Sequence, residues 1–513
     1  HPVLTVTGDP HDIVTELFRV GLGHDDILSG RPVGQPGRCH LSLQQSQPVA
    51  DWLIPQLSAG AFGRRSSVVF ADKEWRGTRP LHTLTLEDSV LYRVLTRRLS
   101  RLLPERLRER VPIEEFRRAP LAVSGAKYVC VTDVNAYYEF VDHDLLATEL
   151  IGQTGDELAV KALRELLAAM LGRHVGIPQV HTASDTLGDV YIDPARRRML
   201  RRGHATFTYS DDFRIAAPTL QIARDALESC EFEMRALGLV LNETKTLTYR
   251  TDSYETSLTA FAEAQRRLLD LDSEDKPGVD LGLLERDYET KEAEDDSDAA
   301  SEVTDTGDED ERRLEAGRRA FELWKNNLGE DINPHDNAVL RTLLARALPV
   351  LGAAGESAPS GWIEAIIRTE PALTPQAAQY LTALGKVGPD QQRLVRSTMD
   401  SIVSKDILST WQSLWFAHVA AHGGAEETSQ PYEQWLHHNV TTGAPAVAAH
   451  AAAALGQIGR GDAELVAAAI ARVGPEWRRL AFAGLIGLDQ AKAHATADDV
   501  LDRLLLTAAA HEQ

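Results

Sequence analysis

Cysteine and long apolar runs are scarce in this sequence, and each shortage excludes a class of protein. The three cysteines, Cys39, Cys130 and Cys230, lie too far apart to form a disulfide framework or a zinc-ligand motif. No apolar run reaches the roughly 18 residues that a membrane-spanning helix needs. The first residues also lack the basic and apolar regions of a secretory signal. We therefore expect a protein of a reducing compartment, the cytoplasm, with no membrane partner.

Positive charge is scarce as well, but unevenly so along the chain. The formal net charge is -22, from 54 basic and 76 acidic residues. Residues 1–250 carry 31 Lys and Arg against 32 Asp and Glu, so nearly all of the excess negative charge lies after residue 250. The first half can therefore still offer basic grooves to a nucleic acid, and the overall charge does not exclude such a partner.

Residues 1–250 mix two kinds of local pattern. Short runs rich in β-branched and aromatic residues predict strands at 68–70 and 128–132. Apolar residues at helical spacing predict amphipathic helices over 84–110, 156–172 and 219–237, the last ending at a Gly238 cap. This half of the chain is predicted to be an α+β region.

An acidic segment separates this region from the rest of the chain. Residues 270–311 contain 19 Asp and Glu but three Lys and Arg, and they cannot bury enough apolar surface to offset their ordering entropy. We interpret its second half, about residues 290–311, as a solvated linker. The alternative is a negatively charged strip that mimics DNA and covers a basic groove.

Residues 315–513 are rich in Ala and Leu, with helical periodicity and almost no strand signal. A Leu-Gly pair at 351–352 recurs at 384–385, 33 residues later, and again at 455–456. This spacing is typical of stacked helical hairpins of the HEAT type. A helical bundle without repeats is the alternative.

Acidic residues at two places suggest a metal site. Tyr209-Ser210-Asp211-Asp212 stands between two apolar runs, which predicts a hairpin with two acids at its tip. Asp133 directly follows the strand predicted at 128–132, where a strand-end cap is its structural alternative. Phosphoryl transfer to a nucleotide uses two Mg²⁺ ions, and Mg²⁺ prefers carboxylate oxygens as ligands. Three such carboxylates would repel one another unless a cation lay between them.

Two further motifs complete an ordered set. Gly176-Ile177-Pro178-Gln179 lies between the two acidic sites, and Gly238-Leu239-Val240-Leu241-Asn242-Glu243-Thr244-Lys245-Thr246 follows the second. The four motifs in this order resemble prokaryotic reverse transcriptases, related to those of group II introns and retrons. The resemblance covers roughly residues 60–250.

The resemblance implies a fold and a division of the chain. It implies right-hand polymerase fingers and a palm with a ferredoxin-like sheet, followed here by an all-α HEAT-like domain. The expected segments are an N-terminal region with fingers at 1–125, a palm at 126–255, a helix plus acidic linker at 256–314 and helical repeats at 315–513.

The resemblance also implies roles for individual residues. Asp133, Asp211, Asp212 and the main-chain carbonyl of Val134 would hold two Mg²⁺ ions, for which Mn²⁺ can substitute. Lys245 would give a proton to the pyrophosphate leaving group. The expected nucleotide contacts are Tyr138 as a steric gate, or else a core aromatic residue; Gln179 against the base pair; and Arg79 and Lys73 on the triphosphate. The arginines of 196–202 are interpreted either as nucleic-acid contacts or as a solvated face.

Two departures from the family pattern bear on the function. Val180 stands where relatives have Gly after the Pro-Gln pair, and Ser184-Asp185 replaces a Ser-Pro pair. The loss of this Gly puts ordinary template copying in doubt. A palm fused to a helical array resembles the abortive-infection and unknown-group defence reverse transcriptases.

The expected function is therefore a DNA polymerase, RNA-directed or template-independent, that adds dNTPs in anti-phage defence. One alternative is a retron-like enzyme that copies a non-coding RNA partner, and another is a nucleotide- or RNA-binding scaffold without polymerase activity. RNA or DNA is the expected partner, with a homo-oligomer formed through the helical domain. A protein side chain is a candidate primer, among Tyr249, Tyr254, Tyr288, Tyr380 and Tyr432.

Overall fold

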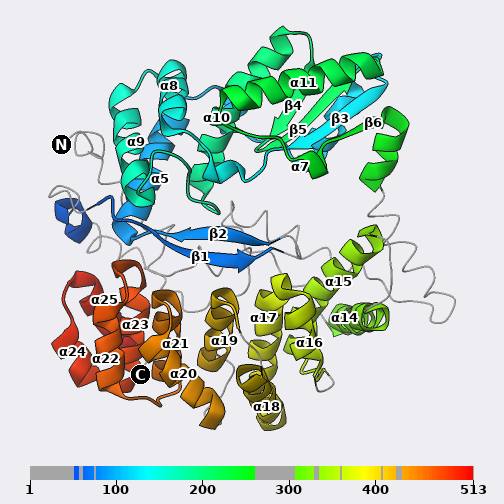
Figure 1. Cartoon of the computed structure of the whole chain (residues 1–513). Coiled ribbons are helices and arrows are strands. Elements are labelled where there is room, and N and C mark those ends of the chain that lie inside the picture. The colour runs from blue at the N-terminus through cyan, green and yellow to red at the C-terminus, as the bar shows by residue number, and fades with distance from the viewer. Residues whose placement is uncertain are drawn as a thin grey trace. The chain divides into compact units, whose positions relative to one another are not determined.

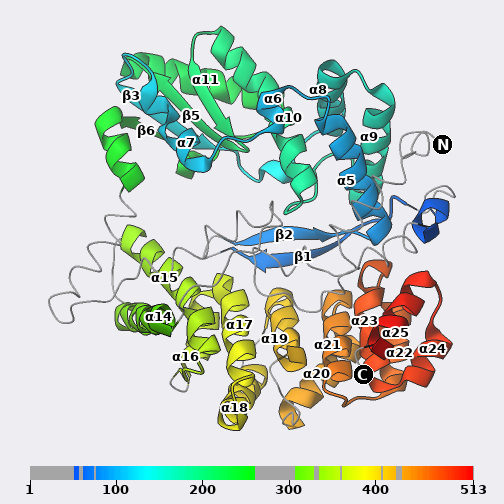
Figure 2. The ribbon, with the colours of Figure 1, turned by 180° about the vertical axis from the view of Figure 1, so that it is seen from behind.

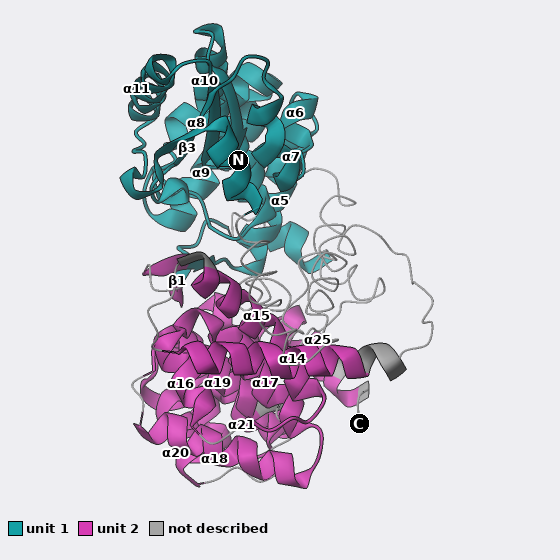
Figure 3. Cartoon of the chain, turned by 90° about the vertical axis from the view of Figure 1, so that its right-hand side faces the viewer, with its two compact units in different colours: residues 1–22, 39–68, 81–259 teal, residues 23–38, 69–80, 260–513 magenta. Residues whose placement is uncertain are grey.

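The chain folds into two compact units, shown in different colours in Figure 3. The computed structural model describes residues 51–56, 62–73, 77–259, 307–328, 334–358, 361–405, 408–422 and 430–511. The described residues of the first unit fall within 39–68 and 81–259, and those of the second within 69–80 and 260–513. The fold is α+β with an all-helical C-terminal region, as the composition of the two halves predicted.

A four-stranded antiparallel sheet forms the centre of the first unit (Figure 1). Its strands, in spatial order, are β4 (Ala205–Tyr209), β5 (Asp212–Ala217), β3 (Tyr128–Asp133) and β6 (Leu247–Arg250). Successive side chains alternate between the two faces of a strand. Phe213 and Ile215 on β5, and Cys130 opposite Ile215 on β3, therefore share one face and are fully buried.

Helices pack against this sheet. The buried face is covered by α10 (Thr182–Arg201) and α11 (Leu220–Ala236), and the Cys130 thiol lies 3.4 Å from the Ala223 carbonyl oxygen of α11. The side chains of Arg214 and Phe207 alternate to the other face of their strands, where the Arg214 guanidinium lies 5.2 Å from the ring centroid of Phe116 in α7 (Ile113–Arg118).

The remaining elements of the first unit precede and follow β3. They include the helices α5 (Leu86–Ser100), α6 (Glu105–Arg108), α8 (His143–Thr154) and α9 (Glu157–Leu171). The residues of the hairpin of β1 (Ser67–Asp72) and β2 (Thr78–Thr83) are shared between the two units, with 69–80 assigned to the second. The predicted strands at 68–70 and 128–132 and the helices at 156–172 and 219–237 are confirmed. The helix predicted over 84–110 is wrong as one element, because Pro104 separates α5 from α6 and lacks the N–H that a continuous helix needs.

The second unit is a stack of helices (Figure 2). Its helices are α14 (Gly307–Asn327), α15 (Pro334–Ala353), α16 (Trp362–Thr369), α17 (Thr374–Gly385), α18 (Pro389–Lys405), α19 (Thr410–His422), α20 (Gln430–Thr442), α21 (Pro445–Gln457), α22 (Ala463–Arg472), α23 (Pro475–Leu488), α24 (Gln490–Thr496) and α25 (Val500–His511). Each of α15, α17, α19 and α21 packs against the next odd-numbered helix, ending at α23. Similarly, α18 packs on α20 and α20 on α22, which gives two parallel layers.

The recurring Leu-Gly pairs lie at the ends of helices in the first of these layers. A Cβ atom at Gly352 in α15 would lie 2.6 Å from the Tyr380 carbonyl oxygen of α17, and one at Gly456 in α21 would overlap the backbone of Gly484 in α23. The glycines therefore allow neighbouring helices to approach closely. The pattern that suggested repeats reflects this packing.

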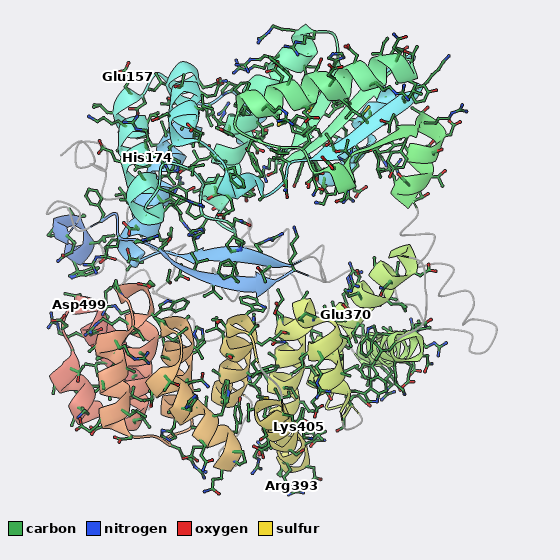
Figure 4. The ribbon with its side chains drawn as sticks, in the orientation of Figure 1. Glu157, His174, Glu370, Arg393, Lys405 and Asp499 are labelled. Carbon is green, nitrogen blue, oxygen red and sulfur yellow. The ribbon has the colours of Figure 1, made fainter. Side chains whose placement is uncertain are left out.

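Ion pairs fasten individual helices of the second unit. Arg341 of α15 lies 2.6 Å from Glu370, with both side chains 12% exposed. The fully buried Asp502 pairs with Arg478 at 2.9 Å and with Arg479, which also pairs with Asp499. Figure 4 labels Glu370 and Asp499 among the side chains of the stack.

The acidic segment lies outside the described residues up to residue 306. The helix α14 begins at Gly307, within the predicted linker of about residues 290–311, and the predicted domain start at 315 stays a prediction. Among the described residues, no helix is both long and apolar enough to cross a membrane.

Candidate active site

Two adjacent strands bring the predicted acids together. Asp133 at the end of β3 is directly opposite Asp212 at the start of β5. Residues directly opposite each other in an antiparallel pair point to the same face. Tyr209 of β4 is opposite Asp212, so the three side chains form one row across the sheet. This row lies where β3 ends and the β4–β5 hairpin turns.

The hairpin turn adds Asp211 to the pair. Ser210 takes a left-handed conformation with φ 52°, and the carbonyl oxygen of Asp211 accepts the main-chain N–H of Val134 at 3.1 Å. The favoured two-residue hairpin turns have a positive φ at their first central residue, which is the position of Ser210. The turn thereby ties Asp211 to the end of β3 beside Asp133. The prediction of a hairpin with acids at its tip is confirmed.

The fourth motif runs alongside the same end of β3. The main-chain N–H of Asn242 donates to the Asp133 carbonyl oxygen at 2.8 Å, and that of Asn135 to the Val240 carbonyl oxygen at 2.9 Å. A short helical turn at Glu243–Lys245 then directs Lys245 back to the acids. Its ammonium nitrogen lies 2.7 Å from Asp133 Oδ2.

The acids repel one another enough to change a pKa. Burial, followed by the charges of Asp133 and Asp212, raises the pKa of Asp211 to about 6. Lys245 opposes this shift, and the Arg214 guanidinium lies 3.4 Å from Asp212 Oδ1. A divalent cation bound there would offset the repulsion between the carboxylates and so stabilise the site.

These residues have the chemistry that suits Mg²⁺, but their side chains are not arranged around a common point. Carboxylate oxygens are its preferred ligands, and the main chain brings Asp133, Asp211 and Asp212 to the same end of the sheet. Within the described parts of the chain, no three His, Cys, Asp or Glu side chains are arranged as a metal cage. The ammonium group of Lys245 instead pairs with one of the Asp133 oxygens. The fourth predicted ligand, Val134, is 2% exposed and follows Asp133 directly.

The two neighbouring tyrosines after Asp133 have different environments. Tyr137 is 2% exposed and donates its hydroxyl to the Gly188 carbonyl oxygen at 2.5 Å, so it is the core aromatic residue of the pair. Tyr138 is partly exposed, and its hydroxyl donates to Asp185 Oδ1 at 2.8 Å and lies 3.2 Å from Ser210 Oγ. Tyr138 therefore stands beside the acidic hairpin, where a gate residue is expected.

Gln179 is held near Tyr138 by Glu139, the residue that follows Tyr138 in the sequence. Its amide Nε2 donates to Glu139 Oε1 at 3.2 Å, and Arg173 Nη2 donates to the other oxygen of Glu139 at 2.6 Å. The His82 ring, whose Nε2 lies 3.9 Å from Glu139 Oε1, and hydrogen bonds from Arg173 and Gln179 lower the pKa of Glu139 to about 2. The next residue, Val180, has φ 64°, a conformation that glycine adopts readily and valine rarely does.

Lys73 and Arg79 are the predicted site residues that the first unit does not bring to the acids. Both lie in the part of the β1–β2 hairpin that belongs to the second unit. They are exposed there, and the main-chain N–H of Lys73 donates to the Gly77 carbonyl oxygen at 2.8 Å. Their contact with a triphosphate stays a prediction.

Most arginines of 196–202 have a role that the sequence did not indicate. Arg196 and Arg197 lie 3.2 and 2.8 Å from the carboxylate oxygens of Asp193, which is 1% exposed. Arg198 and Arg202 each lie 2.9 Å from Glu233, which is 2% exposed. These four cations neutralise buried acids, whereas for Arg201 no partner is described.

The sequence analysis missed Arg110 and Asp189, which lie behind the acidic hairpin. Arg110 Nε donates to Asp189 Oδ2 at 2.5 Å, and its guanidinium lies 5.4 Å from the ring centroid of Tyr209. Both residues line a cavity of about 310 Å³ between α6, α7, α10 and β4. Arg110 and Asp189 are 79 residues apart, so no local pattern links them. The one signal in the sequence was the spacing of Asp185 and Asp189, which places both acids on one face of a helix.

Comparison with protein-family models finds no match for the chain, and comparison with curated proteins finds no similar sequence. The reverse-transcriptase resemblance therefore rests on the four short motifs, and the family of the chain stays a prediction.

Proposed function

We propose that the chain is a DNA polymerase of the reverse-transcriptase type, whose catalytic acids are Asp133, Asp211 and Asp212. The observation that carries the proposal is the direct opposition of Asp133 and Asp212 on neighbouring strands, with Asp211 at the turn between β4 and β5. Four motifs scattered over more than a hundred residues of sequence supply this one region. On this proposal the sheet with α10 and α11 is a polymerase palm, and the helical stack is a HEAT-like domain.

The proposed roles follow from the contacts of each residue. Two bound Mg²⁺ ions would lower the charge on the triphosphate and activate the attacking 3′-hydroxyl. Asp133, Asp211, Asp212 and the Val134 carbonyl would hold them, because the chain offers hard oxygen donors there. Lys245 lies 2.7 Å from Asp133 and is assigned to protonate the leaving pyrophosphate. Tyr138 and Gln179 are assigned to the sugar and base of the incoming nucleotide.

The biological role is proposed from the order of the domains. A palm followed by a helical array resembles reverse transcriptases of phage defence, and we propose anti-phage defence as the use of this polymerase. A retron-like copier of a partner RNA is the second candidate. A scaffold without activity is the third, but a binding protein would gain nothing from an acid such as Asp211, whose ionisation is unfavourable in the folded state.

Protein priming would require an accessible tyrosine hydroxyl. Tyr254, Tyr380 and Tyr432 are each 2% exposed. Their hydroxyls donate to the main-chain carbonyls of Arg117, Glu356 and Phe416. Tyr249 is partly exposed, and Tyr288 lies outside the described residues. Of the four described candidates, Tyr249 is the best placed to act as a primer.

The test is incorporation of each labelled dNTP with Mg²⁺, with and without an RNA template, by the wild type and by Asp211→Ala/Asp212→Ala. Products are resolved on a denaturing gel before and after protease and nuclease treatment. We expect wild-type incorporation that the double variant loses, and product that stays on the protein until protease is added. Product made only with RNA would favour the retron-like candidate, and no incorporation by the wild type would overturn the proposal.

A further inference from the structure

Two acids on α10 contact two different parts of the candidate site. Asp185 Oδ1 accepts the Tyr138 hydroxyl at 2.8 Å, and the Asp189 carboxylate interacts with the main-chain N–H of Ser210 and accepts from Arg110, whose guanidinium lies over Tyr209. Residues four apart on a helix lie on one face, so both acids point the same way from α10. One helical turn therefore contacts both the residue before Asp211 and the tyrosine beside it.

A single cation joins the two acids. Arg110 Nε donates to Asp189 Oδ2 at 2.5 Å, and Arg110 Nη2 donates to the main-chain oxygen of Asp185 at 3.0 Å. The same guanidinium stacks on Tyr209, the residue before Ser210. The side chain of Asp189 is 17% exposed and that of Arg110 33%, so this pair is screened from water more than a surface ion pair.

These contacts form a closed ring around the hairpin turn. The Tyr138 hydroxyl lies 3.2 Å from Ser210 Oγ, which links the two ends of the network directly. Ser210 is a non-glycine residue with φ 52°, a conformation that the surrounding contacts must hold in place. The ring therefore fixes both the turn that carries Asp211 and the position of the Tyr138 ring.

We propose that Arg110, Asp185 and Asp189 are positioning residues that hold the acidic hairpin, and that Asp185 sets the sugar selectivity of the site by immobilising Tyr138. The holding of the hairpin is inferred from the contacts alone, whereas the sugar selectivity rests on the proposed polymerase function. An aromatic ring rejects a 2′-hydroxyl by overlap, and overlap is effective when the ring cannot move aside.

We call the contacts by which Arg110, Asp185 and Asp189 hold the acidic hairpin the tether. It is tested by hydrogen exchange of the segment 205–217 in the full chain. Asp189→Ala removes the carboxylate that holds Arg110 and interacts with the Ser210 N–H, whereas Asp189→Asn keeps an oxygen there. We expect the Ser210 amide to exchange at least roughly tenfold faster in Asp189→Ala and at the wild-type rate in Asp189→Asn. Arg110→Gln supplies a second disruption with the same expected direction, and Glu228→Ala, an exposed residue of α11, is the control. Wild-type exchange in both Asp189→Ala and Arg110→Gln would overturn the tether.

The selectivity is tested by the ratio of kcat/KM for a dNTP to that for the matching rNTP. We expect Asp185→Ala to lower this ratio at least roughly tenfold. Asp185→Asn should restore the ratio, because its amide oxygen can still accept the Tyr138 hydroxyl. An unchanged ratio in Asp185→Ala would overturn the role of Asp185. No incorporation by the wild type would instead overturn the proposed function and the selectivity with it, while hydrogen exchange still decides the tether.

Discussion

Asp211 is the residue whose ionisation the folded state most clearly opposes in the candidate site. Its pKa is raised from 3.8 to about 6, so the folded chain binds more protons than the unfolded chain between these values. Stability therefore falls as the pH rises from about 4 to about 6 and stays reduced above that range. This loss follows first from burial of the Asp211 carboxylate and then from the charges of Asp133 and Asp212.

The substitution Asp211→Asn should remove that loss. We expect the variant to exceed the wild type in free energy of unfolding by about 1–3 kcal/mol at pH 8 in the presence of EDTA, with no difference below pH 4. Urea unfolding at several pH values measures both quantities. Asp225→Asn, an exposed acid of α11, should shift stability by less than about 0.5 kcal/mol at either pH. A pH-independent effect of Asp211→Asn would contradict the assignment of the raised pKa.

Val180 offers a second test at the residue scale. Its φ of 64° is unfavourable for a β-branched side chain, and its side chain is 37% exposed, so little burial compensates for the strain. Val180→Gly should increase the free energy of unfolding by about 1 kcal/mol, because relief of strain exceeds the entropy lost by glycine. Chemical denaturation of Val180→Gly and Val180→Ala measures the effect. Equal stability of the two variants would contradict the strain.

At the scale of elements, close packing of helices depends on glycine. Gly456 of α21 contacts the backbone of Gly484 in α23, where an added Cβ would overlap main-chain atoms. Gly456→Ala should therefore lower the free energy of unfolding by about 1–3 kcal/mol, as overpacking does elsewhere. Gly388→Ala is the matched control, because its Cβ would meet one side-chain oxygen at 3.4 Å, an ordinary contact distance. Thermal unfolding of the two variants measures the difference, and an equal midpoint would contradict the packing account.

Elements with a continuous local pattern could be predicted from the sequence. The strand at 128–132 and the helix at 219–237 carry their own periodicity, so the structure has them nearly as predicted. The helix over 84–110 failed because apolar spacing continues across Pro104, where the backbone cannot stay helical. The start of α14 was missed because acidic residues at a helix N-terminus look like a linker in composition.

At the scale of the whole molecule, the site residues that belong to sequence motifs could be predicted. The residues that contact them from distant parts of the sequence could not. Asp133 and Asp212 were found from their flanking strands, and the structure places them opposite each other. Arg110 contacts Asp189 across 79 residues of sequence, and no local pattern records such a contact. The buried acids Asp193 and Glu233 likewise pair with arginines of the basic run at 196–202, and no local pattern indicated these ion pairs.

The predicted site residues do not all belong to the same unit. Asp133, Asp211, Asp212 and Lys245 belong to the first unit, whereas Lys73 and Arg79 belong to the second. If both arginine and lysine engage the triphosphate, Arg79→Ala should raise the KM for dNTPs at least roughly tenfold with a smaller effect on kcat. Steady-state kinetics over a range of dNTP concentrations measures the two constants. An unchanged KM would remove Arg79 from the site.

The most direct test of the central claim is Mg²⁺-dependent dNTP incorporation by Asp211→Asn beside the wild type. The substitution keeps the size of the side chain and removes its charge, so it separates the chemistry of the acid from the fold around it. The account predicts a variant that is more stable at pH 8 and yet incorporates dNTPs at least roughly a thousandfold more slowly. Incorporation within tenfold of the wild type would contradict the claim that these acids are the catalytic centre.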